Sequence, residues 1–425
     1  MYFNLREFAS FTRQALFPTR NGPARPTPKR IGVLAGFYAI FVPVEFVTQI
    51  SLLLDNLLFS AYRQHAVEQP LFIIGNPRSG TTFLQRLLAQ DRRNFSCMKL
   101  WEILLAPSIL QRRVVQGSIG LDRRLSSPLR RLARRLRSTW EEENPMHPTG
   151  LLAPEEDQYL LIHIWSTLAV WQFGAILKDE AEAYTHFDLQ IPENQRRKIT
   201  AFHKEAIQRH LYAHRRAGDR PKHYLAKNPS ATPKIASMRA GFPDGRFIYL
   251  VRNPLDMVPS MISTLDYTWQ VLGDPLERYA TRDYVVEMAK HWYTYPLEQL
   301  AEMPDETYAI VRFNDLVDDP NQAVRSIYDR FGLDVDSGFG QVLKDATERS
   351  RHYESDHGYS LDAVGLSRAE IVTEFRDIFQ RFDFDTREGT DGADARRNRS
   401  VNACQREPTP AQRLNPEEPA AQPLG

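Results

Sequence analysis

The sequence predicts an α/β protein in which a mainly parallel, P-loop-like sheet is flanked by helices and carries helical insertions. Three observations predict this class. Apolar runs of strand length recur along the chain, turns rich in glycine or arginine follow two of them, and helical patterns separate them. Strands are expected near residues 71–75, 222–227, 246–251 and 308–313, with the helical insertions at 95–220.

The first expected strand, residues 71–75, runs directly into a turn and a helix. Its apolar residues end in Gly75, and the apolar residues after Thr82 are spaced as on one face of a helix. A turn in this position presents backbone N–H groups at a helix N-terminus, where the helix dipole adds partial positive charge. The segment therefore predicts an anion site of the kind that holds a phosphate.

This turn differs from a nucleoside triphosphate loop in one residue. Gly75 and Gly80 have the spacing of that motif, but Thr81 stands where the motif needs a lysine for the outer phosphates. Arg78 offers planar, paired donors to a phosphate or sulfate, and Ser79 adds a short hydroxyl donor. A kinase or NTPase is thereby disfavoured.

The expected strand at 246–251 ends in a second set of anion-binding residues. Arg252 follows the strand directly, and Ser260 comes two helical turns later. Open parallel sheets bind ligands at the carboxyl ends of their strands, so the two side chains are placed to hold a second phosphate. Taken alone, an arginine at a strand end is as often an ion-pair residue as a ligand.

Together these segments resemble the PAPS-dependent sulfotransferases, which transfer a sulfuryl group from 3′-phosphoadenosine 5′-phosphosulfate (PAPS) to an acceptor hydroxyl or amine. Residues 77–82, Pro-Arg-Ser-Gly-Thr-Thr, resemble that family's loop in the arginine form seen in tyrosylprotein and many bacterial sulfotransferases. Residues 224–229 resemble its middle strand, and residues 154–157 and 359–366 resemble the bacterial branch in particular. The resemblance covers residues 70–385, most of the chain.

The resemblance implies roles for individual residues in an in-line transfer that needs no metal. Lys227 is expected beside the bridging oxygen, and Arg252 and Ser260 at the 3′-phosphate. Arg78 and Lys227 are candidate catalytic cations, because fixed positive charge stabilises the negative charge that gathers in the transition state. The residues expected to hold the 5′-phosphosulfate are Arg78, Ser79, Gly80, Thr81 and Thr82.

The acceptor hydroxyl also needs a base to take its proton. The histidine that follows the middle-strand lysine in cytosolic sulfotransferases is absent here, because Asn228 takes that place. Glu102 is the first candidate, since tyrosylprotein sulfotransferases use a glutamate at a slightly shorter spacing from the loop arginine. His147 and the pair Glu155 and Glu156 remain alternatives.

Composition points to an enzyme without a polyelectrolyte partner. The chain has 425 residues, with 54 Lys and Arg against 53 Asp and Glu, so the net charge of +1 does not suggest nucleic acid. Cys97 and Cys404 show no metal or redox spacing, and the eleven histidines are expected to form no metal-ligand cluster.

The chain is expected to have three parts: an N-terminal region at 1–69, a catalytic domain at 70–385 and a disordered tail at 386–425. In the first part, residues 31–54 are apolar but interrupted by Glu45. A helix lying in the membrane interface or packed on the body is favoured over one that spans, because spanning would bury this carboxylate in lipid. The catalytic domain is then cytoplasmic, with peripheral membrane contact.

Two other function classes remain open at this point: a small-molecule kinase, and a non-catalytic nucleotide-binding protein attached to a membrane. The acceptor is not identified, although a lipid, a lipid-linked glycan or another apolar alcohol suits the leucine- and aromatic-rich insertions. One of these, residues 159–177, is expected to form a buried helix beside the acceptor.

Overall fold

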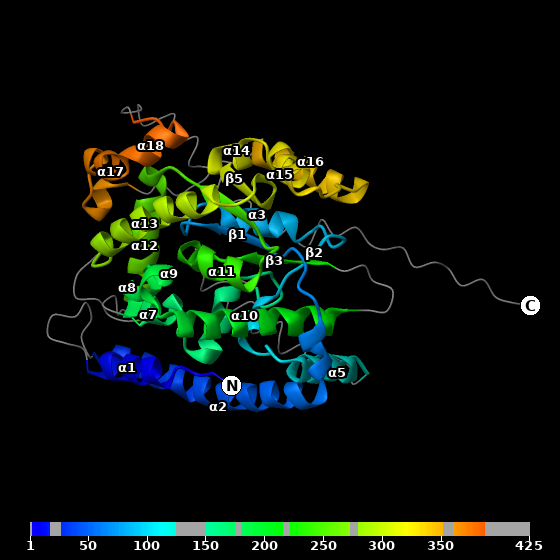
Figure 1. The fold of residues 1–425 in the computed structure, drawn as a ribbon. Helices are drawn as coiled ribbons and strands as arrows, with labels where there is room; N and C mark the ends of the chain where they lie inside the picture. Colours follow the sequence, from blue (N-terminus) through cyan, green and yellow to red (C-terminus); the bar gives the residue numbers. More distant parts are fainter. Residues whose placement is uncertain are drawn as a thin grey trace, which may run out of the picture.

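The computed structural model describes residues 2–17, 27–124, 150–174, 180–215, 222–272, 279–351 and 360–386. The expectations for His147 and for the C-terminal tail lie outside these ranges. Within them the chain builds an α/β fold around one five-stranded sheet in the order β2-β3-β1-β4-β5, with every neighbouring pair parallel (Figure 1). The predicted fold class is confirmed.

Four of the five strands coincide with the predicted segments, and the short edge strand β2 was not predicted. The strands are β1 (Leu71–Gly75), β2 (Phe95–Ser96), β3 (His223–Lys227), β4 (Arg246–Val251) and β5 (Tyr308–Arg312). β1 lies at the centre of the sheet between β3 and β4. Because the three strands are parallel, their carboxyl ends lie side by side.

Helices cover both faces of the sheet. The α-helices are α1 (Leu5–Leu16), α2 (Pro28–Leu58), α3 (Thr81–Leu88), α4 (Leu100–Leu104), α5 (Ile109–Arg124), α7 (Leu168–Phe173), α8 (Glu180–Thr185), α9 (Phe187–Gln190), α10 (Glu193–His214), α11 (Ile235–Gly241), α12 (Pro254–Leu272), α13 (Arg282–Ala301), α14 (Phe313–Asp318), α15 (Pro320–Phe331), α16 (Ser337–Arg351), α17 (Arg368–Glu374) and α18 (Arg376–Phe382). Short 3-10 helices occur at η1 (Ser60–Gln64), η2 (Asp157–Ile164), η3 (Pro229–Lys234), η4 (Asp305–Thr307) and η5 (Asp362–Val364).

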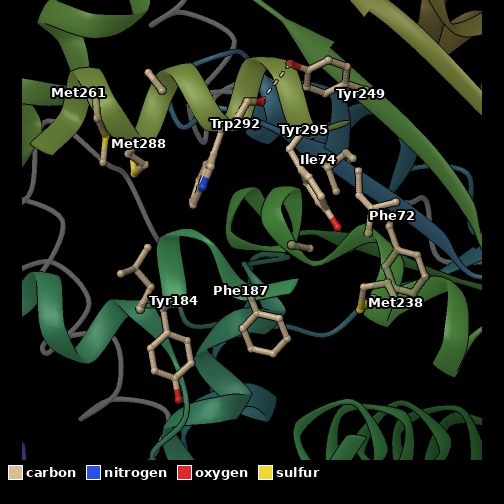
Figure 2. Packing of buried hydrophobic residues seen from close by; sticks show 14 of the residues in the cluster. Phe72, Ile74, Tyr184, Phe187, Met238, Tyr249, Met261, Met288, Trp292 and Tyr295 are labelled. Atoms are coloured by element: carbon tan, nitrogen blue, oxygen red, sulfur yellow. Dashed lines mark hydrogen bonds between the residues drawn. The ribbon is translucent and has the colours of Figure 1, made fainter. Parts of the chain in front are cut away.

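The sheet divides the core into two apolar clusters because successive strand residues point to opposite faces. From β1, Leu71 and Ile73 join the cluster formed with α3, α15 and α16. Phe72 and Ile74 join the larger cluster on the other face, where they lie near Met238 of α11 and Tyr295 of α13 (Figure 2). Both faces of β1 are therefore buried, which explains its uninterrupted apolar sequence.

The N-terminal helices α1 and α2 belong to the same core as the sheet. Phe11 of α1 is buried, and its ring lies 5.3 Å from that of Trp165 and 5.7 Å from that of Trp171, measured between centroids. In Figure 1, α1 and α2 run along one side of the molecule, below α10 and beside α5.

Candidate active site

The loop between β1 and α3 has a backbone that its glycines make possible. Gly75 has a φ of 142°, and a Cβ there would lie 2.4 Å from the carbonyl oxygen of Leu250 on β4. Gly80 precedes α3 with a φ of 85°, and a Cβ there would lie 2.7 Å from the ring of Phe313. Arg78 also has a positive φ, 67°, between these two points. The two glycines thus allow the sharp turn between β1 and α3, which places the N-terminus of α3 close behind the end of β1.

Two polar side chains of this loop are fully buried without a hydrogen-bond partner among the described residues. They are the amide of Asn76 and the hydroxyl of Ser79. A buried polar group without a partner costs about 1–3 kcal/mol, so proteins seldom leave several together unless a ligand completes them. Ser79 is one of the predicted phosphosulfate residues, whereas Asn76 was not predicted, although it lies inside the same motif.

Arg252 and Ser260 lie against this loop. The Nε of Arg78 donates a hydrogen bond to Ser260 Oγ at 3.0 Å, and the Nη1 of Arg252 donates to the Arg78 carbonyl at 2.8 Å. The guanidinium of Arg252 lies 4.6 Å from the centre of the Phe313 ring, and Tyr293 donates to the Arg252 carbonyl at 2.6 Å. The structure therefore gathers the two halves of the predicted nucleotide site, which are more than 170 residues apart in sequence.

Lys227, at the end of β3, forms a buried cluster with two carboxylates. Its Nζ is fully buried and donates to Glu156 Oε1 at 2.6 Å and to Glu155 Oε1 at 3.3 Å. Burial would lower the pKa of Lys227, but the two carboxylates outweigh it and raise this pKa. Burial raises the pKa of Glu156, with Lys227 opposing and Glu155 adding to the rise, since two carboxylates share one ammonium.

The 3-10 helix η3, which follows β3, is fixed to the phosphate loop. The hydroxyl of Thr232 accepts a hydrogen bond from the Gly75 N–H at 2.9 Å and donates to the Gly75 carbonyl at 3.0 Å. Asn228 donates to Asp157 at 3.0 Å, which ties the same segment to the chain that carries Glu155 and Glu156. No local pattern indicates the role of Thr232, because the contact joins residues 157 positions apart.

Glu102, the first candidate for the base, lies in a different environment. One carboxylate oxygen accepts from the Lys99 N–H at 2.9 Å, which caps α4, and the other accepts from His214 Nε2 at 2.5 Å. Burial would raise the pKa of Glu102, but the bond from His214 and the charges around it, including Arg112, lower it well below its usual range. A carboxylate with so low a pKa is a weak base.

The histidines were expected to form no metal-ligand cluster, and among the described residues one group of side chains has ligand atoms close enough to hold an ion. Glu102, His210 and His214 place their ligand atoms within 4.8 Å of one another, and the two histidines are one helical turn apart on α10. However, the fully buried Arg112 guanidinium lies 3.3 Å from Nδ1 of His210. This cation occupies the approach that a metal ion would need, so the group is better suited to an internal ion pair.

The comparisons with known proteins identify the family. A model of the Sulfotransferase family matches residues 70–337, which include the loop, Lys227, Arg252 and Ser260. The chain is a sulfotransferase. The omega-hydroxy-beta-dihydromenaquinone-9 sulfotransferases Stf3 of Mycobacterium bovis and Mycobacterium tuberculosis are each 25% identical over 337 residues, 75% of this chain and 76% of theirs.

Solved structures agree with this fold. Sulfotransferase STF1 from Mycobacterium tuberculosis H37Rv matches with a TM-score of 0.64 and 18% identity, over 88% of this chain and 92% of that one. Sulfotransferase STF9 from Mycobacterium avium matches with a TM-score of 0.65 and 16% identity, over 91% and 98%. Neither the kinase nor the non-catalytic binding protein is retained as an alternative for this sulfotransferase.

Proposed function

We propose that this sulfotransferase moves a sulfuryl group from PAPS to the hydroxyl of an apolar, lipid-like acceptor. The observation that carries the donor assignment is the convergence of Arg78, Ser260 and Arg252 on one loop that also buries the unpaired groups of Asn76 and Ser79. A phosphate loop with a second arginine and serine beside it suits a nucleotide with phosphate at both the 5′ and 3′ positions.

The loop residues would hold the 5′-phosphosulfate. The Asn76 amide and the Ser79 hydroxyl would gain hydrogen-bond partners there, together with N–H groups at the start of α3, where Thr81 and Thr82 stand. Arg252 and Ser260 would hold the 3′-phosphate, because a guanidinium binds phosphate through two parallel hydrogen bonds. PAPS supplies the sulfuryl group. When this group leaves, the negative charge of the broken bond stays on the phosphate oxygen of PAP.

Lys227 and Glu156 are the groups that we assign to the transfer itself. A fully buried ammonium at the end of β3 can stabilise charge that develops on the bridging oxygen, because electrostatic interactions strengthen where water is excluded. Glu156 retains 14% side-chain exposure and has a raised pKa, so its carboxylate can be reached by an acceptor and is a stronger base than Glu102. Glu155, at 5% exposure, would hold the lysine in place while Glu156 takes the proton.

The acceptor class rests on the relatives and on the apolar surface of this chain. The Stf3 relatives are named for a menaquinone acceptor that carries a hydroxyl group. Here the helix α2 displays large apolar side chains to the outside, which suits an enzyme that meets a membrane-resident substrate.

Calorimetric titration with PAP, the desulfated nucleotide, tests the donor assignment. PAP is expected to bind more tightly than adenosine 5′-phosphate or ATP, and Arg252→Ala is expected to weaken PAP binding about 10- to 100-fold through loss of charged hydrogen bonds. Arg246→Ala is the matched control, because Arg246 begins the same strand, at the end away from the proposed site. Equal affinity for PAP and adenosine 5′-phosphate, or a preference for ATP, would contradict the assignment.

A further inference from the structure

Helix α2 is oriented with its polar side toward the protein and its apolar side outward. Glu45, Thr48, Ser51 and Asp55 are buried against the body. Among the large apolar side chains left exposed are Ile40, Phe46, Val47, Leu53, Leu57 and Leu58, each at least half exposed. A surface helix of a protein in water has the reverse arrangement.

Specific contacts with the body fix this orientation. The Oε2 of Glu45 lies 2.7 Å from His163 Nδ1 in a buried pair. The carboxylate of Asp55 accepts from the backbone N–H groups of Ile109 and Leu110 at 2.8 and 3.0 Å, which caps the start of α5. The helix cannot turn its apolar side inward without leaving these carboxylates without partners, at a cost of several kcal/mol in hydrocarbon or in the core.

The same contacts determine how α2 can meet a membrane. With its apolar sequence and 31 residues, α2 is long enough to cross a bilayer. However, its buried carboxylates are satisfied by residues of η2 and α5, so crossing would carry these charges and their partners into lipid. A helix that lies along the interface keeps every one of these contacts and buries only the outer face.

On α1, on α2 and on residues 109–118 of α5, the exposed charged side chains have one sign. Within residues 2–17, 27–65 and 109–118 every exposed charged side chain is basic, whereas Glu7, Glu45 and Asp55 are turned at least partly inward. Figure 1 shows α1, α2 and α5 on the same side of the molecule. The exposed basic residues are Arg6, Arg13, Lys29, Arg63 and Arg113.

We infer that the outer face of α2 is a docking surface for an anionic lipid bilayer, with the helix lying in the interface and the basic residues at its border. A bilayer offers an apolar medium for the exposed side chains of this face. Its negative headgroups would meet the basic residues around the face. A second copy of the chain would instead bring like charges together around the contact. The inference rests on α2 and its contacts and is independent of the proposed donor and acceptor.

Vesicle co-sedimentation of the full chain tests this inference. The vesicles contain phosphatidylcholine alone or mixed with phosphatidylglycerol, and the double variant Phe46→Ser with Leu53→Ser removes apolar area from the outer face of α2. Leu189→Ser with Ile310→Ser is the matched control, because these exposed apolar side chains lie on α9 and β5. Both variants change surface residues, and circular dichroism with urea unfolding verifies that each remains folded.

The wild-type protein and the control are expected to sediment with the anionic vesicles, less at high salt. The α2 variant is expected to lose at least about tenfold in partitioning. Extraction at alkaline pH is expected to release the protein from the vesicles. A protein held by a spanning helix would stay with them. Three results would overturn the inference: no vesicle binding, equal binding by both variants, or concentration-dependent dimers that disappear only in the α2 variant while vesicles are ignored.

Discussion

The two candidate bases are distinguished by changing each to its uncharged isostere. In Glu102→Gln, the amide oxygen can still accept the Lys99 N–H bond that caps α4, so the variant keeps the cap while it removes the charge and the acceptor for His214 Nε2. In Glu156→Gln, Lys227 keeps Glu155 as a charged partner. The pair of variants therefore separates a stabilising carboxylate from a reacting one.

The two changes are expected to act on different quantities. Glu102→Gln removes the carboxylate that most opposes the burial of Arg112 and leaves Asp55 as the remaining one, and breaking such a buried cluster costs about 3–5 kcal/mol of unfolding free energy. Because the folded pKa of Glu102 is lowered, its stabilising effect is present above the unfolded pKa of about 4.5 and is lost as the pH falls below it. Glu156→Gln is expected to cost little stability and to lower kcat about 100-fold or more, as expected for loss of a general base.

Urea unfolding measures the first effect, and PAP release with a long-chain alcohol as acceptor measures the second. At a temperature where both variants are folded, Glu102→Gln is expected to keep kcat within about threefold of wild type. The reasoning is refuted if Glu102→Gln unfolds as the wild type does and loses as much kcat as Glu156→Gln. That result would return Glu102 to the role that the sequence first suggested.

Two further changes test the backbone of the loop and a buried charge. Gly75→Ala forces a Cβ to 2.4 Å from Leu250 O at a φ of 142°, so its free energy of unfolding in urea is expected to fall by about 3 kcal/mol or more. Gly117→Ala is the control, because a Cβ there meets nothing within 4 Å and should stabilise the helix slightly. Unchanged stability in Gly75→Ala would show that the strand relaxes freely. Burial lowers the pKa of Lys234 to about 8. Between about pH 8 and pH 10.5 the unfolded chain therefore binds a proton that the folded chain does not, so the free energy of unfolding rises across this pH range. Lys234→Met should remove that rise and add up to about 3 kcal/mol at pH 7, and a pH profile parallel to that of the wild type would exclude this explanation.

The strands could be predicted where burial alone determines the sequence. β1 and β4 lie in the middle of the sheet, so both faces need apolar residues and the runs are unmistakable. β2 has two residues at the sheet edge and shows no such run. The single helix expected at 159–177 is instead η2 and α7, because Trp165 adopts a φ of 51° and Thr167 caps the new helix through a bond from the Ala169 N–H.

The candidate site divides in the same way. Arg78, Arg252 and Ser260 follow strands whose carboxyl ends meet, so their proximity follows from a parallel sheet once the strands are assigned. The pairing of Lys227 with Glu156 depends on where a long insertion returns to the sheet, which no local pattern encodes. For Glu102, spacing along the chain suggested a base, whereas the partner that governs it, His214, is 112 residues away.

The buried pair of Glu45 and His163 has a practical consequence for anyone who would shorten this protein. Removing the apolar N-terminal region at residue 69 looks attractive for solubility, but it would strip His163 of its carboxylate and Trp165 of the ring of Phe11. Both residues lie within ten positions of Glu156, on the segment that follows it. Detergent or lipid that shields α2 is therefore a safer route to a soluble, active enzyme than deletion.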